Sequence, residues 1–262
     1  MLHKAYHPAR DGATAPTLLI AHGLFGSARN WSVIARNLAS FRDVVAVDMR
    51  NHGQSPRATT QSYPDMAGDL ADVIGTLAGH GQSGPVDVLG HSMGGKAAME
   101  LALTHGDRMR KLVVADIAPV AYGHDQSHHI AAMRGLDLTG LSVRSEADRR
   151  LAAAVADPAL RAFFLQSLDL KAAGGLVWRL NLDVLEAEMP KIVGWPGTQG
   201  RFDGPALFLT GSESQYVRPE HRAAIKALFP NARFAKLTGA GHWLHADKPR
   251  EFESVVEAFL SA

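Results

Sequence analysis

The stretch Val86-Asp87-Val88-Leu89-Gly90-His91-Ser92-Met93-Gly94-Gly95 indicates an apolar strand that turns sharply into a helix. Residues 90–94 fit the pattern G-x-S-x-G, in which a serine occupies the turn. Such a turn forces the serine into strained backbone angles and lifts its hydroxyl clear of the sheet, so the close packing requires glycine on both sides. The helix that follows directs free N–H groups towards developing negative charge. We therefore predict that Ser92 is a nucleophile.

The same residues nearly match a phosphate-binding loop. Residues 90–97 follow the pattern G-x-x-x-x-G-K-[ST] up to its last position, and they also lie between a strand and a helix. That last position holds Ala97, which has no hydroxyl for a magnesium ion. The nucleophile interpretation also explains two further segments that a nucleotide site would leave without a role, so we favour it.

Short apolar runs alternate with amphipathic stretches on both sides of this turn. Runs of strand length occur at residues 17–21, 43–47, 86–89, 111–115 and 206–210, and helix-length segments at 63–77, 95–105 and 220–228. Continuous apolar strands are typical of a parallel sheet that helices cover on both sides. The alternation predicts a doubly wound α/β fold, in which ligands bind at the carboxyl ends of the strands.

The interval 118–203 interrupts this alternation. It contains helix-like segments at 128–134, 145–156, 158–168 and 182–189, and no convincing strand. We predict that residues 118–203 form a helical cap inserted into a core made of residues 1–117 and 204–262. A cap of this kind would shield a pocket and shape its specificity.

A candidate base and a candidate oxyanion hole flank the nucleophile in the sequence. His242 lies in Gly239-Ala240-Gly241-His242-Trp243, after a strand-like run at 233–237, from where it could reach back to Ser92 and accept its proton. The oxyanion hole needs only main-chain N–H groups, and we assign them to Leu24, in the loop after the first apolar run, and to Met93. His245 is expected to pack structurally.

The pocket is expected to be lined by Phe25, His91 and Trp243, although a plain core role for Phe25 is equally consistent with the sequence.

The triad acid does not occupy its usual place. Most proteins with this arrangement carry an aspartate after the penultimate strand, but here Gly211-Ser212-Glu213-Ser214 has a serine at that position, which cannot hold an imidazolium as a carboxylate does. Asp116, at the end of the strand after the nucleophile strand, is the best candidate, and Glu213 is the alternative. Asp48 is expected to hold the turn after its own strand. We hypothesise that Ser214 hydrogen-bonds His242 or Asp116 as a fourth member of the network.

Together these segments resemble the YbfF-type esterase family of the α/β-hydrolase superfamily. The resemblance covers most of the chain outside residues 118–203 and rests on residues 22–27, 48–53, 90–96, 116–119, 214–217 and 239–243. It implies an α/β-hydrolase fold and a triad of Ser92, Asp116 and His242 assisted by Ser214. It also implies hydrolysis of short-to-medium acyl esters and thioesters, including acyl-CoA, without a metal or organic cofactor.

Composition limits the other possibilities. The chain has 262 residues, 27 basic against 26 acidic, and no basic stripe that would indicate nucleic-acid binding. Its 0 cysteines exclude thiol catalysis. No apolar run approaches the ~18 residues that a membrane span needs, and no signal peptide is visible, so we expect a soluble cytoplasmic protein. The expected partner is a small-molecule ester or thioester substrate, and the sequence does not indicate an oligomeric state.

Several isolated side chains are open to a second interpretation. His124 and His128 have the i, i+4 spacing of a metal-binding pair, but no third ligand is evident and a place on the surface or pocket rim is favoured. Lys96, Arg134 and Arg179 could meet a phosphate of CoA, although isolated cations are usually solvated.

Two other function classes remain open. A lyase-type member of the superfamily, such as the menaquinone-pathway synthase, shares the motifs at residues 22–27 and 90–95 but retains the usual acid, so Ser214 argues against it. A non-catalytic ligand receptor on the same scaffold could keep the triad. An epoxide hydrolase or dehalogenase is disfavoured because those enzymes use aspartate in place of Ser92.

Overall fold

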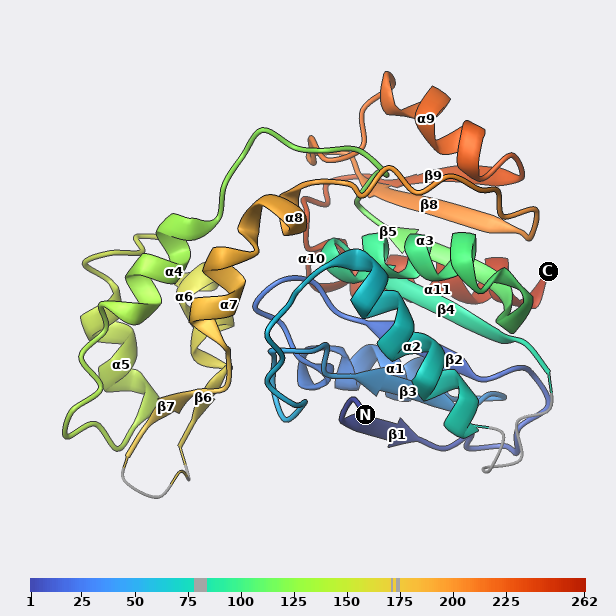
Figure 1. The fold of residues 1–262 in the computed structure, drawn as a ribbon. Coiled ribbons are helices and arrows are strands. Elements are labelled where there is room, and N and C mark those ends of the chain that lie inside the picture. The colour runs from blue at the N-terminus through green and yellow to red at the C-terminus, as the bar shows by residue number, and fades with distance from the viewer. Residues whose placement is uncertain (78–83, 171, 173–174) are drawn as a thin grey trace.

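The computed structural model describes residues 1–77, 84–170, 172 and 175–262, and its centre is a seven-stranded sheet in the order β1-β3-β2-β4-β5-β8-β9 (Figure 1). The strands are β1 (Lys4–His7), β2 (Leu18–Ala21), β3 (Val44–Val47), β4 (Val86–His91), β5 (Met109–Ala115), β8 (Ala206–Gly211) and β9 (Ala232–Leu237). β1 pairs antiparallel with β3, and the other neighbours are parallel. The fold is the predicted α/β hydrolase fold.

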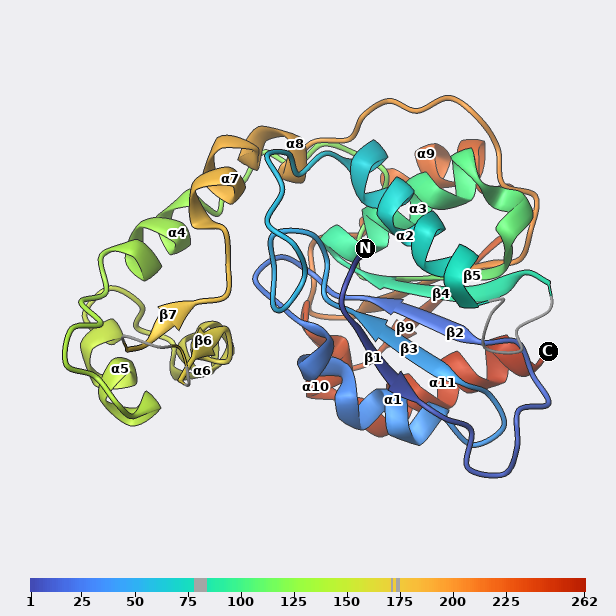
Figure 2. The same ribbon diagram turned by 60° about the horizontal axis from the view of Figure 1, so that its bottom comes forward.

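Helices cover both faces of the sheet, as the views in Figures 1 and 2 show. They are α1 (Ser32–Leu38), α2 (Tyr63–Leu77), α3 (Met93–Thr104), α9 (His221–Leu228), α10 (Leu244–Asp247) and α11 (Pro249–Ser261), with 3₁₀ turns η1 (Ala28–Trp31) and η3 (Gly106–Arg108). Successive residues of the central strands enter different apolar clusters: Leu19 joins α2 and α3, whereas Leu18 and Ile20 join α1 and α11. Burial on both faces explains why β2 and β3 are continuously apolar.

The segment between β5 and β8 forms a group of helices to one side of the sheet (Figure 1). It contains α4 (Ser127–Arg134), α5 (Arg144–Leu151), α6 (Pro158–Leu165), α7 (Leu182–Ala187) and α8 (Met189–Val193). It also contains β6 (Leu168–Asp169) and β7 (Val177–Trp178), which pair antiparallel, so the expectation that no strand occurs here was wrong. Two-residue strands are too short to leave an alternating pattern in a sequence. We call residues 118–203 the insertion.

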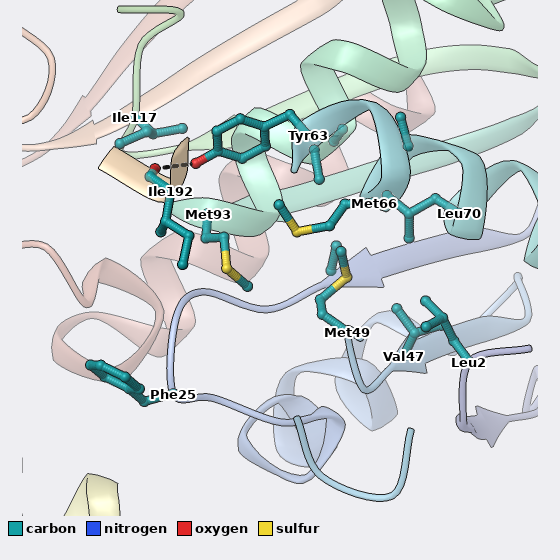
Figure 3. Close-up of a cluster of buried hydrophobic side chains, with 14 of the residues drawn as sticks. Leu2, Phe25, Val47, Met49, Tyr63, Met66, Leu70, Met93, Ile117 and Ile192 are labelled. Carbon is teal, nitrogen blue, oxygen red and sulfur yellow. Dashed lines mark hydrogen bonds between the residues drawn. The ribbon is translucent and has the colours of Figure 1, made fainter. Parts of the chain in front are cut away.

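The end of the insertion joins the core on the α2 and α3 face, where Figure 3 shows the contact. Ile192 of α8 lies near Met93 and Ile117, and the Tyr63 hydroxyl donates a hydrogen bond to the Ile192 carbonyl at 2.5 Å. Because Met93 directly follows Ser92, the predicted nucleophile, this contact brings the insertion to the edge of the predicted site. None of the helices in the described ranges combines the length and apolar character that a membrane crossing requires.

Candidate active site

Ser92 occupies the turn between β4 and α3 with φ 53°, in the left-handed region that residues other than glycine rarely adopt. A Cβ on Gly90 would collide with the Gly94 carbonyl, and a Cβ on Gly94 would collide with the Ala21 and His22 carbonyls. The two glycines of the motif are thus required by close contacts between backbones, as the sequence pattern predicts.

The sheet register brings the predicted site residues to one edge. Ala21 pairs with Gly90 and His91 pairs with Ala115, so the loop that begins at His22, the nucleophile turn and Asp116 follow three adjacent strands. These are carboxyl ends of parallel strands, where the fold class places ligands.

Ser92, His242 and Asp116 form a continuous chain of hydrogen bonds. The Ser92 Oγ lies 3.0 Å from His242 Nε2, and His242 Nδ1 lies 2.7 Å from Asp116 Oδ2. Asp116 is fully buried. With a proton on Nδ1 donated to the carboxylate, Nε2 presents its lone pair to the serine hydroxyl, which is the arrangement that general-base catalysis needs.

The structure also places the carboxylates that the sequence left open. The Asp116 carboxylate accepts further hydrogen bonds from the Ser214 hydroxyl and, at 3.2 Å, from the Gly211 amide. Glu213 is exposed and its amide donates to the Ala240 carbonyl, so it takes no part in this chain of bonds. Asp48 accepts from the amides of Ala28 and Gln54 at 2.7 Å each, which is the turn-holding contact expected of it.

Two aromatic rings contact the His242 ring: Tyr216, which was not singled out in the sequence, and His91, which was expected only to line the pocket. Tyr216 stacks on the His242 ring with ring centroids 3.9 Å apart and planes 19° apart. His91 lies on it at 4.8 Å and its Nε2–H donates to the His242 carbonyl at 2.9 Å. Burial and neighbouring histidines keep the pKa of His91 well below its ordinary value, so His91 stays neutral. His91 therefore fixes the backbone of His242 as well as lining the pocket.

His245 stacks on Trp31 at 4.1 Å, in agreement with the structural role expected for it.

The two amides predicted to form the oxyanion hole, those of Leu24 and Met93, are not engaged in other hydrogen bonds among the described residues. The next amide, that of Phe25, donates instead to His52 Nε2 at 3.1 Å, and Phe25 itself has φ 64°. His52 was not singled out in the sequence, because nothing local indicates that its partner lies 27 positions away.

A cavity of about 280 Å³ lies over Ser92. Phe25, His91 and Trp243 line it, as predicted, together with apolar side chains of the insertion: Leu160, Phe163, Phe164, Ile192 and Val193. His124 also lines it and its Nε2 lies 3.1 Å from the Tyr216 hydroxyl. In the described part of the chain, no group of three or more histidine, aspartate and glutamate side chains is placed to hold a metal.

Lys96 departs from the expectation that isolated cations are solvated. Its side chain is 1% exposed, and the ammonium donates to the carbonyls of Val193, at 3.0 Å, and Gly194, at 2.5 Å. Burial lowers the pKa of Lys96 to about 7. Arg134 and Arg179 form ion pairs within the insertion, with Asp183 and Glu186 and with Asp169 respectively.

Comparisons with known proteins identify the family to which the chain belongs. The family described as alpha/beta hydrolase fold matches residues 16–249. Esterase YbfF of Escherichia coli (strain K12) is 39% identical over 244 residues, which cover 93% of this chain and 92% of that protein. The sn-1-specific diacylglycerol lipase ABHD11 of Mus musculus is 38% identical over 265 residues, which cover 98% of this chain and 85% of that protein.

The solved structures give the same result. A structure described as a marine microorganism esterase is 35% identical, covers 98% of both chains and has a TM-score of 0.91. The chain therefore belongs to the α/β-hydrolase fold family and, within it, to the group that contains the YbfF-type esterases.

Proposed function

We propose that this protein is a serine hydrolase that cleaves carboxylic ester bonds through an acyl-enzyme on Ser92. The observation that carries the proposal is the chain of hydrogen bonds from Ser92 through His242 to the buried Asp116. This chain adjoins a cavity that is also lined by Leu24 and Met93, whose amides have no hydrogen-bond partner within the residues that the structure describes. The names of the relatives, esterase and diacylglycerol lipase, support the same bond class.

The reaction follows from the positions of the groups. His242 Nε2 takes the proton of the Ser92 hydroxyl as Oγ attacks the ester carbonyl, and the amides of Leu24 and Met93 stabilise the resulting oxyanion. His242 then gives that proton to the alcohol oxygen as its bond to the acyl carbon breaks. The alcohol departs, and the acyl group remains bonded to Ser92. Water, deprotonated by the same histidine, releases the acid and regenerates Ser92. Asp116 stabilises the imidazolium in both halves, and Ser214 holds Asp116.

We further propose that the substrates are short-to-medium acyl esters and thioesters, including acyl-CoA, and that the insertion acts as the cap of the pocket. A thiolate is expelled from a tetrahedral intermediate by the same steps, so the same catalytic groups can cleave both esters and thioesters. Apolar side chains of α6 and α8 line the cavity, as an acyl chain requires.

A fluorophosphonate probe tests the nucleophile, and p-nitrophenyl butyrate tests the reaction. We expect the wild-type protein to be labelled and to hydrolyse the ester, and Ser92→Ala to lose labelling and all but a trace of turnover. A panel of p-nitrophenyl esters and acyl-CoAs of graded length then measures the acyl preference. A wild-type protein that binds esters but neither reacts with the probe nor turns them over would instead be a receptor, and the proposal would be wrong.

A further inference from the structure

The oxyanion loop, residues 22–26, is held by a residue of the insertion. Phe25 keeps φ 64°, a conformation that costs a non-glycine residue free energy and persists only where the surroundings enforce it. Both polar groups of Phe25 are engaged: its N–H donates to His52 Nε2 at 3.1 Å, and its carbonyl accepts from the Ser167 hydroxyl at 3.0 Å. The amide of the preceding residue, Leu24, is one of the two candidate oxyanion donors.

The core supplies the first of these contacts through a ring that stays neutral. His52 is fully buried, and its Nδ1–H donates to the Arg50 carbonyl at 2.8 Å, which leaves Nε2 as an acceptor for the Phe25 amide. Burial lowers the pKa of His52 to about 3, so it remains an acceptor at neutral pH. The hydrogen bond to the Phe25 amide is therefore supplied by a core residue.

The insertion supplies the second contact through a residue that is itself fixed. Ser167 lies between α6 and β6 and is 6% exposed. Its amide donates to the Phe164 carbonyl at 2.9 Å, and its carbonyl accepts from the Arg179 amide at 2.8 Å. Phe164 packs edge-on against Phe25 with centroids 5.5 Å apart. The insertion thus meets the oxyanion loop with a hydroxyl and a ring carried by one short segment.

We propose that Ser167 is a positioning residue for the oxyanion hole. Its hydroxyl holds Phe25 in the left-handed conformation that aims the Leu24 amide into the pocket, so the insertion must be seated on the core before Ser92 can react efficiently. The inference rests on the proposed function. It assigns the insertion a part in transition-state stabilisation in addition to covering the pocket.

The test compares Ser167→Ala with Ser145→Ala, the same change at an exposed position on α5. Removal of a whole oxyanion donor costs about 10²–10³-fold in kcat, and a donor that is misaimed rather than removed should cost less. For Ser167→Ala we expect kcat on p-nitrophenyl butyrate to fall about tenfold with KM within about twofold. Inhibition by a butyryl trifluoromethyl ketone, whose serine adduct carries the oxyanion, should weaken by the same factor.

The control variant should match the wild type in all three measurements. The inference is overturned if Ser167→Ala keeps the wild-type kcat and ketone affinity, whether or not its Tm falls, because the hydroxyl would then only stabilise the insertion. A rise in KM at constant kcat also overturns it. Failure of the proposed function looks different, because the wild-type protein itself would then show neither ester turnover nor fluorophosphonate labelling.

Discussion

Asp116 is the most heavily engaged side chain of the site. It is fully buried and accepts hydrogen bonds from His242, Ser214 and the Gly211 amide, so its two oxygens have three donors around them. A buried carboxylate is tolerated only with such compensation. The same donors hold the carboxylate in line with the imidazole, and this orientation is what an acid contributes to catalysis in the proposed mechanism.

Replacing that carboxylate tests its role at the scale of one residue. In Asp116→Asn the amide NH₂ can face His242 Nδ1 and favour the wrong tautomer, so we expect kcat to fall by about 10³–10⁴-fold. Glu213→Gln, a neutralisation at the exposed alternative position, should leave kcat unchanged. The measurement is p-nitrophenyl butyrate hydrolysis, with circular dichroism to confirm folding. Near-wild-type turnover in Asp116→Asn would transfer the acid role to another group.

At the scale of elements, the nucleophile turn depends on backbones that touch. A Cβ on Gly94 would meet the carbonyls of Ala21 and His22, at the end of β2 and the start of the oxyanion loop. We expect Gly94→Ala to destabilise the protein by about 1–3 kcal/mol, as overpacking does, and to reduce activity by displacing that loop.

Gly75→Ala is the matched control for this change. Gly75 lies within α2, and a Cβ there would contact nothing within 4 Å. Alanine is the better helix former by about 0.5–1 kcal/mol, so this variant should be as stable as the wild type or more so. Urea unfolding of the two variants checks both signs. Equal stabilities would show that the turn can relax around an added methyl group.

Elements whose pattern is local could be predicted from the sequence. Strands β2, β3, β4, β5 and β8 coincide with the largely apolar runs singled out in the sequence, and α2 has the predicted bounds, Tyr63–Leu77. β1 was not foreseen, because it is a four-residue, partly exposed strand at the sheet edge and gains its structure from pairing with β3. The short α8 and the β6–β7 pair likewise depend on tertiary contacts rather than on periodicity.

In the candidate site, too, residues marked by a local sequence pattern could be predicted, and residues that act through distant contacts could not. Ser92 and His242 could be chosen because glycine-rich turns mark them, and Asp116 because it ends the strand next to the nucleophile strand. The contacts of Lys96 and Ser167 could not be predicted. Lys96 donates to a backbone carbonyl 97 positions away along the chain, and Ser167 donates to one 142 positions away. A side chain that binds distant main chain leaves no complementary residue type to recognise.

Several histidines in the core of the protein are buried in their neutral form. Burial lowers the pKa of His22 to about 4 and that of His52 to about 3, and it holds the pKa of His91 well below 6.5. His22 accepts from the Met49 amide through Nε2 at 2.9 Å, so its protonation would remove an acceptor from the core. These rings connect the stability of the fold to pH.

The sign of that dependence follows from proton binding. Below about pH 6.5 these histidines are protonated in the unfolded chain but remain neutral in the folded protein. Each of them therefore lowers the free energy of unfolding by about 1.4 kcal/mol for every unit by which the pH decreases. We expect urea-unfolding free energies to drop steeply from pH 6.5 towards pH 4. Above pH 7 they should rise further with pH, because the unfolded chain keeps a proton on Lys96 that the folded protein, with the pKa of this group lowered to about 7, releases. A constant value down to pH 5 would contradict neutral burial of these histidines.

Ser92 and Asp116 end the adjacent strands β4 and β5 with almost the same backbone angle, φ 53° and 54°. In the proposed mechanism the nucleophile and the acid therefore follow two paired strands, and the segment after β8 contributes Ser214 where most members carry the acid. A sequence pattern written for the proposed arrangement should therefore accept an aspartate directly after the strand that follows the nucleophile strand, as well as a carboxylate after the penultimate strand.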